Sequence, residues 1–114
     1  MTDGMRVIKG REAENFMEGS AHCRLYHHDA NLWFGVSSVP VGSQAAIDPG
    51  HDASKELYFC SRGHALVYDG ETYYELEQGD ALLIPPGVPH TLFNIGDAPL
   101  TVIWAGAPGE VASS

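Results

Sequence analysis

From residue 24 onward, turn-forming residues interrupt the chain at intervals of about 8 to 12 positions, and the segments between them are short and largely apolar. The pair Asp69-Gly70 is the clearest interruption, because both residues tolerate the positive φ angles of a tight β-hairpin. The pattern predicts strands at residues 24–28, 32–39, 57–62, 65–68, 72–76, 81–84, 90–95 and 100–105. Short strands at this spacing, with almost no helix, favour an all-β sandwich or closed barrel.

The length of 114 residues suits one domain with one modest hydrophobic core. Residues 1–23 are polar and mixed, so we expect an N-terminal segment that packs on the barrel and is partly helical. A turn or two of helix is predicted within residues 11–17, ended by Gly19. Residues 24–107 are predicted to form the barrel, and residues 108–114 a frayed tail.

Acidic residues outnumber basic ones by 15 to 6, which gives a formal net charge of −9. Such a surface repels phosphate backbones and anionic lipid headgroups, so we expect neither nucleic acid nor membrane as a partner. A strongly anionic substrate would need a metal ion, or one of the few cationic side chains, to hold it. The chain shows no leader-like start, no apolar run of about 18 residues and only two cysteines, which together favour a cytoplasmic location.

The most specific pattern is the segment GDALLIPPGVPHTLFN at residues 79–94. A glycine leads into a short buried strand, a proline-glycine turn ends that strand, and a histidine enters the next strand with its ring toward the barrel interior. The segment matches the second sequence motif of the cupin family at every fixed position, namely Gly79, Pro85, Gly87, His90 and Asn94. The chain therefore resembles the cupins over roughly residues 32–105. This resemblance implies a single-domain double-stranded β-helix, or jelly-roll barrel.

The first cupin motif is partly present. The matching residues are Glu56 and Gly63, with His51 at an accepted distance before Glu56. The family usually has a His-x-His pair at this place. Counting back from His51 puts Pro49 at the first position of the pair, whereas counting forward from Gly42 puts Asp48 there. We therefore expect the loop at residues 47–50 to be bulged relative to the family.

The resemblance implies a divalent metal ion bound by His51, Glu56 and His90, with Asp48 as a candidate fourth ligand. Two imidazoles and one carboxylate leave coordination positions open, as in non-haem Fe(II) sites, and a second carboxylate favours Mn(II) or Fe(II). Zn(II) and Ni(II) can occupy similar sites. Two alternatives remain open: a cupin without metal in which His51 or Glu56 acts as acid or base, and a cupin that binds a small molecule without catalysis.

Strand alternation predicts what else faces the interior beside Glu56. The residues on its face of the strand are Tyr58, Cys60 and Arg62. Tyr58 is a candidate for orienting a substrate oxygen and, with Glu56, for a catalytic role, or it fills the core. Cys60 is a soft ligand, a reactive thiol or a small buried apolar residue.

The same alternation turns several apolar side chains away from the barrel interior. Leu57, Phe59 and Phe93 must be covered by the N-terminal segment, by the other sheet or by a second subunit. Because cupins commonly pair by packing sheets together, the resemblance implies a homodimer. Trp33 and Trp104 are expected in the core or at an interface rather than in a ligand site.

The resulting functional hypothesis is a small metal-dependent enzyme that acts on a small oxygen-containing organic substrate. The resemblance allows a dioxygenase, decarboxylase, isomerase, lyase or polyketide cyclase, all of which use a metal ion bound to a substrate oxygen. The alternative is a non-catalytic module that binds a small molecule or a metal ion, or a metal-free cupin that works by acid–base chemistry.

Overall fold

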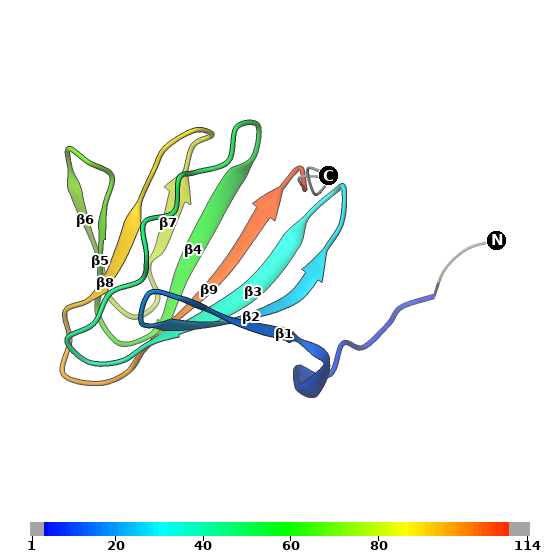
Figure 1. Ribbon diagram of the computed structural model, residues 1–114, viewed down its shortest axis with the longest axis horizontal. Coiled ribbons are helices and arrows are strands. Elements are labelled where there is room, and N and C mark those ends of the chain that lie inside the picture. Colours follow the sequence, from blue (N-terminus) through cyan, green and yellow to red (C-terminus); the bar gives the residue numbers. More distant parts are fainter. Residues whose placement is uncertain (1–3, 110–114) are drawn as a thin grey trace.

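The structure, a computed structural model, describes residues 4–109 and is built almost entirely of strands (Figure 1). The elements in chain order are the 3-10 helix η1 (Gly10–Glu12) and the strands β1 (Glu14–Glu18), β2 (Ala21–His28), β3 (Trp33–Val39), β4 (Lys55–Arg62), β5 (Ala65–Tyr68), β6 (Tyr73–Leu76), β7 (Ala81–Ile84), β8 (Thr91–Asn94) and β9 (Leu100–Ala107). Every strand predicted from residue 24 onward is present, so the predicted all-β fold is confirmed.

The strands form two antiparallel sheets around one core. The large sheet has the order β1-β2-β3-β9-β4-β7, and the small sheet has the order β6-β5-β8. Residues 44–48 run antiparallel beside β8, with bridges from Gln44 to Phe93 and from Asp48 to His90, and so extend the small sheet. Buried residues from both sheets meet in a single cluster that includes Val39, Val67 and Leu100. This is the double-stranded arrangement that the sequence predicted.

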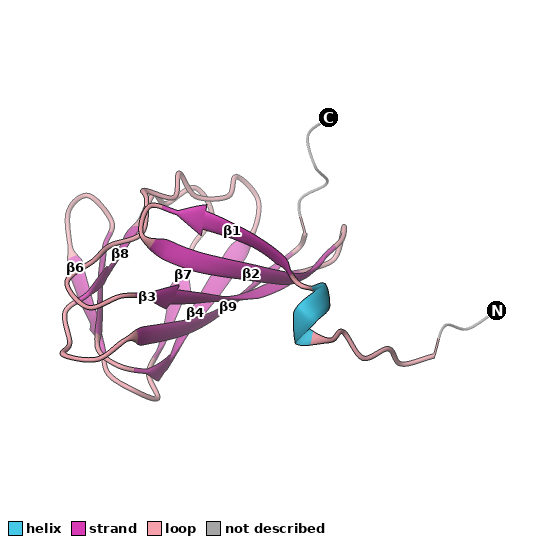
Figure 2. Cartoon of the chain, turned by 60° about the horizontal axis from the view of Figure 1, so that its bottom comes forward, coloured by secondary structure: helices cyan, strands magenta, loops and turns pink. Residues whose placement is uncertain are grey.

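The N-terminal segment contributes an edge strand to the large sheet rather than a helix of two turns. The helical part is confined to η1, and β1 pairs with β2 along its length, from Glu14 opposite Leu25 to Glu18 opposite Ala21 (Figure 2). The predicted helix at residues 11–17 is therefore wrong beyond residue 12. The backbone groups of β1 find partners on the exposed edge of β2, and that pairing overrides a weak local preference for helix. The predicted tail lies mostly outside the described residues.

Burial along β4 alternates as the sequence predicted. Glu56, Tyr58 and Cys60 are buried, whereas Leu57 and Phe59 on the opposite face are exposed. A register shift between Cys60 and Arg62 then breaks the alternation. Such an irregularity turns the following side chain away from its expected face, and Arg62 is exposed. Within the described residues, no helix is long and apolar enough to cross a membrane.

The side-chain amide of Asn94 makes three hydrogen bonds to backbone groups, which explains why the motif has an amide at this position. Its Nδ2 group donates to the carbonyl of Val39 at 3.0 Å and to that of Ala98 at 2.9 Å. Its Oδ1 atom accepts from the backbone N–H of Gly96 at 2.9 Å. A buried side chain that offers two donors and one acceptor thus ties the end of β8 to the end of β3 and to the turn before β9.

Candidate metal centre and ligand cavity

A cavity of about 230 Å³ opens between the two sheets, beside the start of β4 and the segment that precedes β8. All residues predicted as ligands or catalytic groups line it, namely Asp48, His51, Glu56, Tyr58 and His90. They come from three separate stretches of the chain, and the closure of the barrel brings them together. Strand pairing and loop geometry therefore position the site.

Asp48 and His90 are held opposite each other by their own backbones. The N–H of Asp48 donates to the carbonyl of His90 at 2.8 Å, and the N–H of His90 donates to the carbonyl of Asp48 at 2.9 Å. The backbone N–H of Gly50 donates to Asp48 Oδ1 at 2.8 Å, which leaves Oδ2 at 3.7 Å from His90 Nε2. Of the two residues that the sequence offered at the first position of the His-x-His pair, Asp48 therefore faces the histidine.

The hydrogen bonds of His90 define which ring nitrogen is available as a ligand. Its Nδ1 lies 2.9 Å from the carbonyl of Val88, which can only accept, so Nδ1 carries the proton. Nε2 then has a lone pair directed into the cavity, where it accepts a hydrogen bond from the Tyr58 hydroxyl at 3.0 Å. A carbonyl that fixes the tautomer in this way is the usual support of a metal-binding histidine.

Glu56 is buried among apolar and aromatic groups and has one unusual oxygen. Its Oε2 accepts from the indole N–H of Trp33 at 3.2 Å. Its Oε1 is buried and makes no hydrogen bond to any described residue, although His90 Nε2 lies 3.5 Å and His51 Nε2 3.9 Å away. A buried carboxylate oxygen without a donor is costly, and either a hydrogen-bond donor or a cation at this point would offset that cost.

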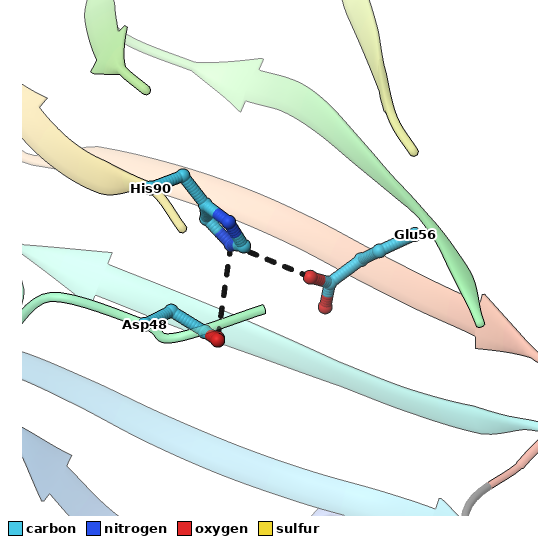
Figure 3. Close-up of side chains that lie close together, drawn as sticks. All are labelled: Asp48, Glu56 and His90. Carbon is cyan, nitrogen blue, oxygen red and sulfur yellow. Dashed lines mark ion pairs between the residues drawn. The ribbon is translucent and has the colours of Figure 1, made fainter. Parts of the chain in front are cut away.

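Figure 3 shows Asp48, Glu56 and His90 pointing toward one another, and all three line the cavity. Each offers one ligand atom, and the three atoms lie within 4.8 Å of one another. Such a spacing suits donors that share one ion. The ring of His51 contacts that of Trp33, with centroids 4.4 Å apart and planes tilted by 39°. His51 lies beside Glu56 at the edge of the cluster and is the least buried of the four.

The electrostatics of the cluster keep Tyr58 protonated. Burial, together with the negative charges of Glu56 and Asp48, raises the pKa of Tyr58 well above its ordinary value, so the hydroxyl acts as a donor. Burial lowers the pKa of His90, but the neighbouring Glu56 carboxylate, the Val88 carbonyl and Asp48 outweigh it and raise the pKa overall. The two carboxyl groups of Asp48 and Glu56 lie close together in this cluster, and a bound cation would reduce the repulsion between them when both are ionised.

Several cavity residues were missed by the sequence analysis. Beyond the ligand cluster the walls include Phe16, Glu18, Cys23, Ser37 and Trp104. Strand alternation in β2 and β3 would have placed Cys23 and Ser37 on the inner face, since they are paired across the two strands. No local signal pointed to Glu18, because residues 11–17 directly before it were predicted to be helical and no strand was predicted there.

The two tryptophans lie flat on the inner face of the large sheet, and glycines make room for them. A Cβ atom at Gly35 or at Gly106 would overlap the indole of Trp104 or of Trp33, respectively. Trp104 donates its indole N–H to Ser37 Oγ at 2.8 Å. The tryptophans were expected in the core or at an interface. Trp33 is indeed buried, but both rings also line the cavity.

Two other residues of β4 lie away from the cavity. Cys60 is fully buried in the hydrophobic core and its thiol contacts the carbonyl of Gly63, which agrees with the reading as a small buried apolar residue. Arg62 follows the register shift in β4 and does not reach the cavity wall.

A sequence profile of the cupin domain matches residues 35–106 of this chain. The chain belongs to the cupin family. The resemblance inferred from the second motif is thereby confirmed.

The chain is also similar to an uncharacterized protein, MJ1618, of Methanocaldococcus jannaschii, with 33% identity over 97 residues that cover 80% of this chain and 75% of that protein. Among solved structures, an uncharacterized conserved protein with a double-stranded β-helix domain from Klebsiella pneumoniae is similar with a TM-score of 0.78. It is 19% identical, and the match covers 94% of this chain and 93% of that one.

A predicted oxalate decarboxylase from Thermotoga maritima is similar with a TM-score of 0.71 and 19% identity, over 90% of this chain and 98% of that one. At these identities the two solved structures support the fold and carry no activity over to this cupin.

Proposed function

We propose that this cupin is a metal-dependent enzyme that acts on a small oxygen-containing organic substrate, with the metal ion held by Asp48, Glu56 and His90 and completed by His51. The observation that carries the proposal is the buried Oε1 atom of Glu56, which has no hydrogen-bond donor among the described residues and faces the available Nε2 of His90. A divalent cation at this point would offset the cost of the buried carboxylate.

The donor set favours particular metals. Two carboxylates with one or two imidazoles form an oxygen-rich site, which suits Mn(II) or Fe(II) better than softer ions, while Zn(II) and Ni(II) also accept such ligands. When bound, the metal would act as a Lewis acid toward a substrate oxygen. The proposal covers dioxygenase, decarboxylase, isomerase, lyase and cyclase chemistry.

The chain itself supplies orientation and proton control. The Val88 carbonyl holds His90 in the tautomer with an unprotonated Nε2, and the Trp33 indole donates to the Glu56 carboxylate. The Tyr58 hydroxyl, which donates to His90 Nε2 in this structure, lies where it can instead donate to a substrate oxygen. Glu56 and Tyr58 are thus the proposed catalytic residues.

A second candidate is a metal-free cupin that works by acid–base chemistry. The observation in its favour is the Tyr58–His90 hydrogen bond, which engages the same nitrogen that a metal ion would take. In this reading Tyr58 and His90 form a proton-transfer pair beside Glu56. Metal content separates the two candidates, and turnover of a substrate separates either of them from a non-catalytic binding module.

The test is elemental analysis of protein purified without a tag or chelator, in the wild type and in His90→Ala. We expect about one equivalent of metal per chain in the wild type and none in His90→Ala, with an unchanged circular dichroism spectrum. The matched control is His22→Ala, an exposed histidine outside the cavity. Equal metal content in His90→Ala and the wild type would refute the ligand assignment. A metal-free wild type, even after incubation with Fe(II) or Mn(II), would favour the acid–base candidate.

We also propose a homodimer that packs through the outer face of the large sheet, in the cytoplasm. Two apolar rows cross this face in register, formed by Phe34, Ala105, Leu57 and Leu83 and by Val36, Ile103, Phe59 and Ala81. Leu83 is 58% and Leu57 48% exposed in the single chain, so a second copy would remove this surface from water. Analytical ultracentrifugation should show a dimer for the wild type and a monomer for Leu83→Lys. A monomeric wild type would contradict the proposal.

A further inference from the structure

The charge of the cavity wall limits what the cavity can hold. Three carboxylates line it, those of Glu18, Asp48 and Glu56. Among the described residues that form its wall there is no lysine and no arginine. The chain has six such residues in all, so their absence from this wall leaves only the histidines His28, His51 and His90, among the described lining residues, as groups that can carry positive charge.

A bound divalent cation would leave Glu18 as the excess charge. The two positive charges of the ion would balance Asp48 and Glu56, but Glu18 lies outside that cluster on β1, where its Oε1 contacts the Cys23 thiol at 3.5 Å. Burial, with the Asp48 and Glu56 carboxylates adding to it, raises the pKa of Glu18. The shift shows that this wall already tolerates negative charge poorly, and a second anion beside Glu18 would meet the same penalty.

The remaining surface suits a flat apolar group. The indoles of Trp33 and Trp104 lie across Gly106 and Gly35, and Phe16 adds a third aromatic wall. The volume of about 230 Å³ exceeds the roughly 150 Å³ that suffices for benzene in an apolar cavity. One substituted ring therefore fits, and Ser37 and Glu18 offer hydrogen-bonding groups to a substituent.

We propose that the cavity selects a single-ring, aromatic or similarly apolar substrate that carries no negative charge in the part lying against Glu18. The proposal rests on the proposed function in taking this cavity as the substrate site, and it deepens that function by naming the substrate class. It also separates this cupin from enzymes of small dicarboxylates, because a compact dianion would place its second carboxylate against the acidic wall and would leave the aromatic walls uncovered.

The test uses three probes of similar size that differ in the charge of one substituent: p-cresol, tyramine and 4-hydroxybenzoate. Both tryptophans of the chain line the cavity, so quenching of tryptophan fluorescence reports binding directly. Titrations are made at pH 8, with and without added Co(II), on the wild type, Glu18→Gln and Glu14→Gln. Glu14→Gln is the matched control, since it removes the same charge from an exposed position on the same strand outside the cavity.

We expect p-cresol and tyramine to bind the wild type at least about tenfold more tightly than 4-hydroxybenzoate, from the repulsion of two like charges at short range. Glu18→Gln should shrink that ratio to about threefold or less, and Glu14→Gln should leave it unchanged. Equal or tighter binding of 4-hydroxybenzoate to the wild type, a ratio that Glu18→Gln does not alter, or no binding of any probe would overturn the proposal. Failure of the metal site would show separately, as identical titrations with and without Co(II) beside a retained charge preference.

Discussion

Gly35→Ala tests whether the Trp104 indole is held flat against the sheet by the absence of a side chain. A Cβ atom at position 35 would lie 2.5 Å from Cζ2 and Cζ3 of Trp104 and closer still to Cη2. Since ordinary contacts begin near 3.4 Å, the ring would have to move by about 1 Å or more. That movement would also strain the bond from the indole N–H to Ser37 Oγ.

The expected net destabilisation is about 2 kcal/mol, within a range of about 0.5–4 kcal/mol. Overpacking costs about 1–3 kcal/mol, and loss of the indole hydrogen bond adds about 0.5–1.5 kcal/mol. Replacing glycine by alanine within a strand stabilises the fold by about 0.5–1 kcal/mol, because alanine loses less conformational freedom on folding. The free energy of unfolding is measured by urea titration followed by circular dichroism, with an unchanged m-value as the check that the unfolding transition is comparable.

The decisive measurement repeats Gly35→Ala in a Trp104→Phe background. The overlapping atoms belong to the outer ring of the indole, which phenylalanine lacks, so alanine at position 35 should there be neutral or stabilising by up to about 1 kcal/mol. The two sites should therefore couple by about 2 kcal/mol in a double-mutant cycle. An equal cost of Gly35→Ala in both backgrounds would refute the steric reasoning.

Three further predictions follow from single residues. Burial raises the pKa of Cys23 to about 11, so at pH 8 iodoacetamide should modify this thiol at least about 100-fold more slowly in the folded protein than in urea, as followed by mass spectrometry; equal rates would contradict its burial. His27 and two backbone amides lower the pKa of Asp29 to about 2, so its contribution to stability should be complete above pH about 4 and lost as the pH falls through 2; an NMR titration that gives an unshifted value would contradict the contacts. Asn94→Ala should lower the free energy of unfolding by about 3 kcal/mol in a urea titration, because buried backbone groups lose their partners, whereas a cost below about 1 kcal/mol would show that water replaces the amide.

The fold could be predicted from local patterns because each of them has a short-range cause. Turn residues such as Asp69 and Gly70 divide the chain by their own backbone preferences, and alternation along β4 follows from the pleat of a strand. The spacing of the motif from Gly79 to Asn94 identified the family. A turn, a buried strand and a second turn must fit within these residues, which restricts where the glycines and prolines can stand. The helix predicted at residues 11–17 was wrong because β1 draws its stability from the edge of β2, which no local window contains.

The residues of the candidate site also fall into two groups, those that local sequence patterns predict and those that only long-range contacts place. Glu56, Tyr58 and His90 could be chosen from the sequence, because strand period and motif spacing decide which way they point. The choice between Asp48 and Pro49 could not, since it depends on the backbone pairing of Asp48 with His90 across 42 residues of chain. The sequence analysis did not predict that Glu18, Ser37 and the two tryptophans would line the cavity.

The sequence alone thus determined the strands from residue 24 onward, the family, and the candidate residues Glu56, Tyr58 and His90, because these follow from strand period and motif spacing. Only the tertiary structure decided the cavity wall around these residues. Closure of the barrel brings Glu18 of the edge strand β1 to the cavity wall, and the absence of side chains at Gly35 and Gly106 lets two indoles lie along that wall. Such contacts join residues far apart in sequence, and their geometry exists only once the sheets have packed.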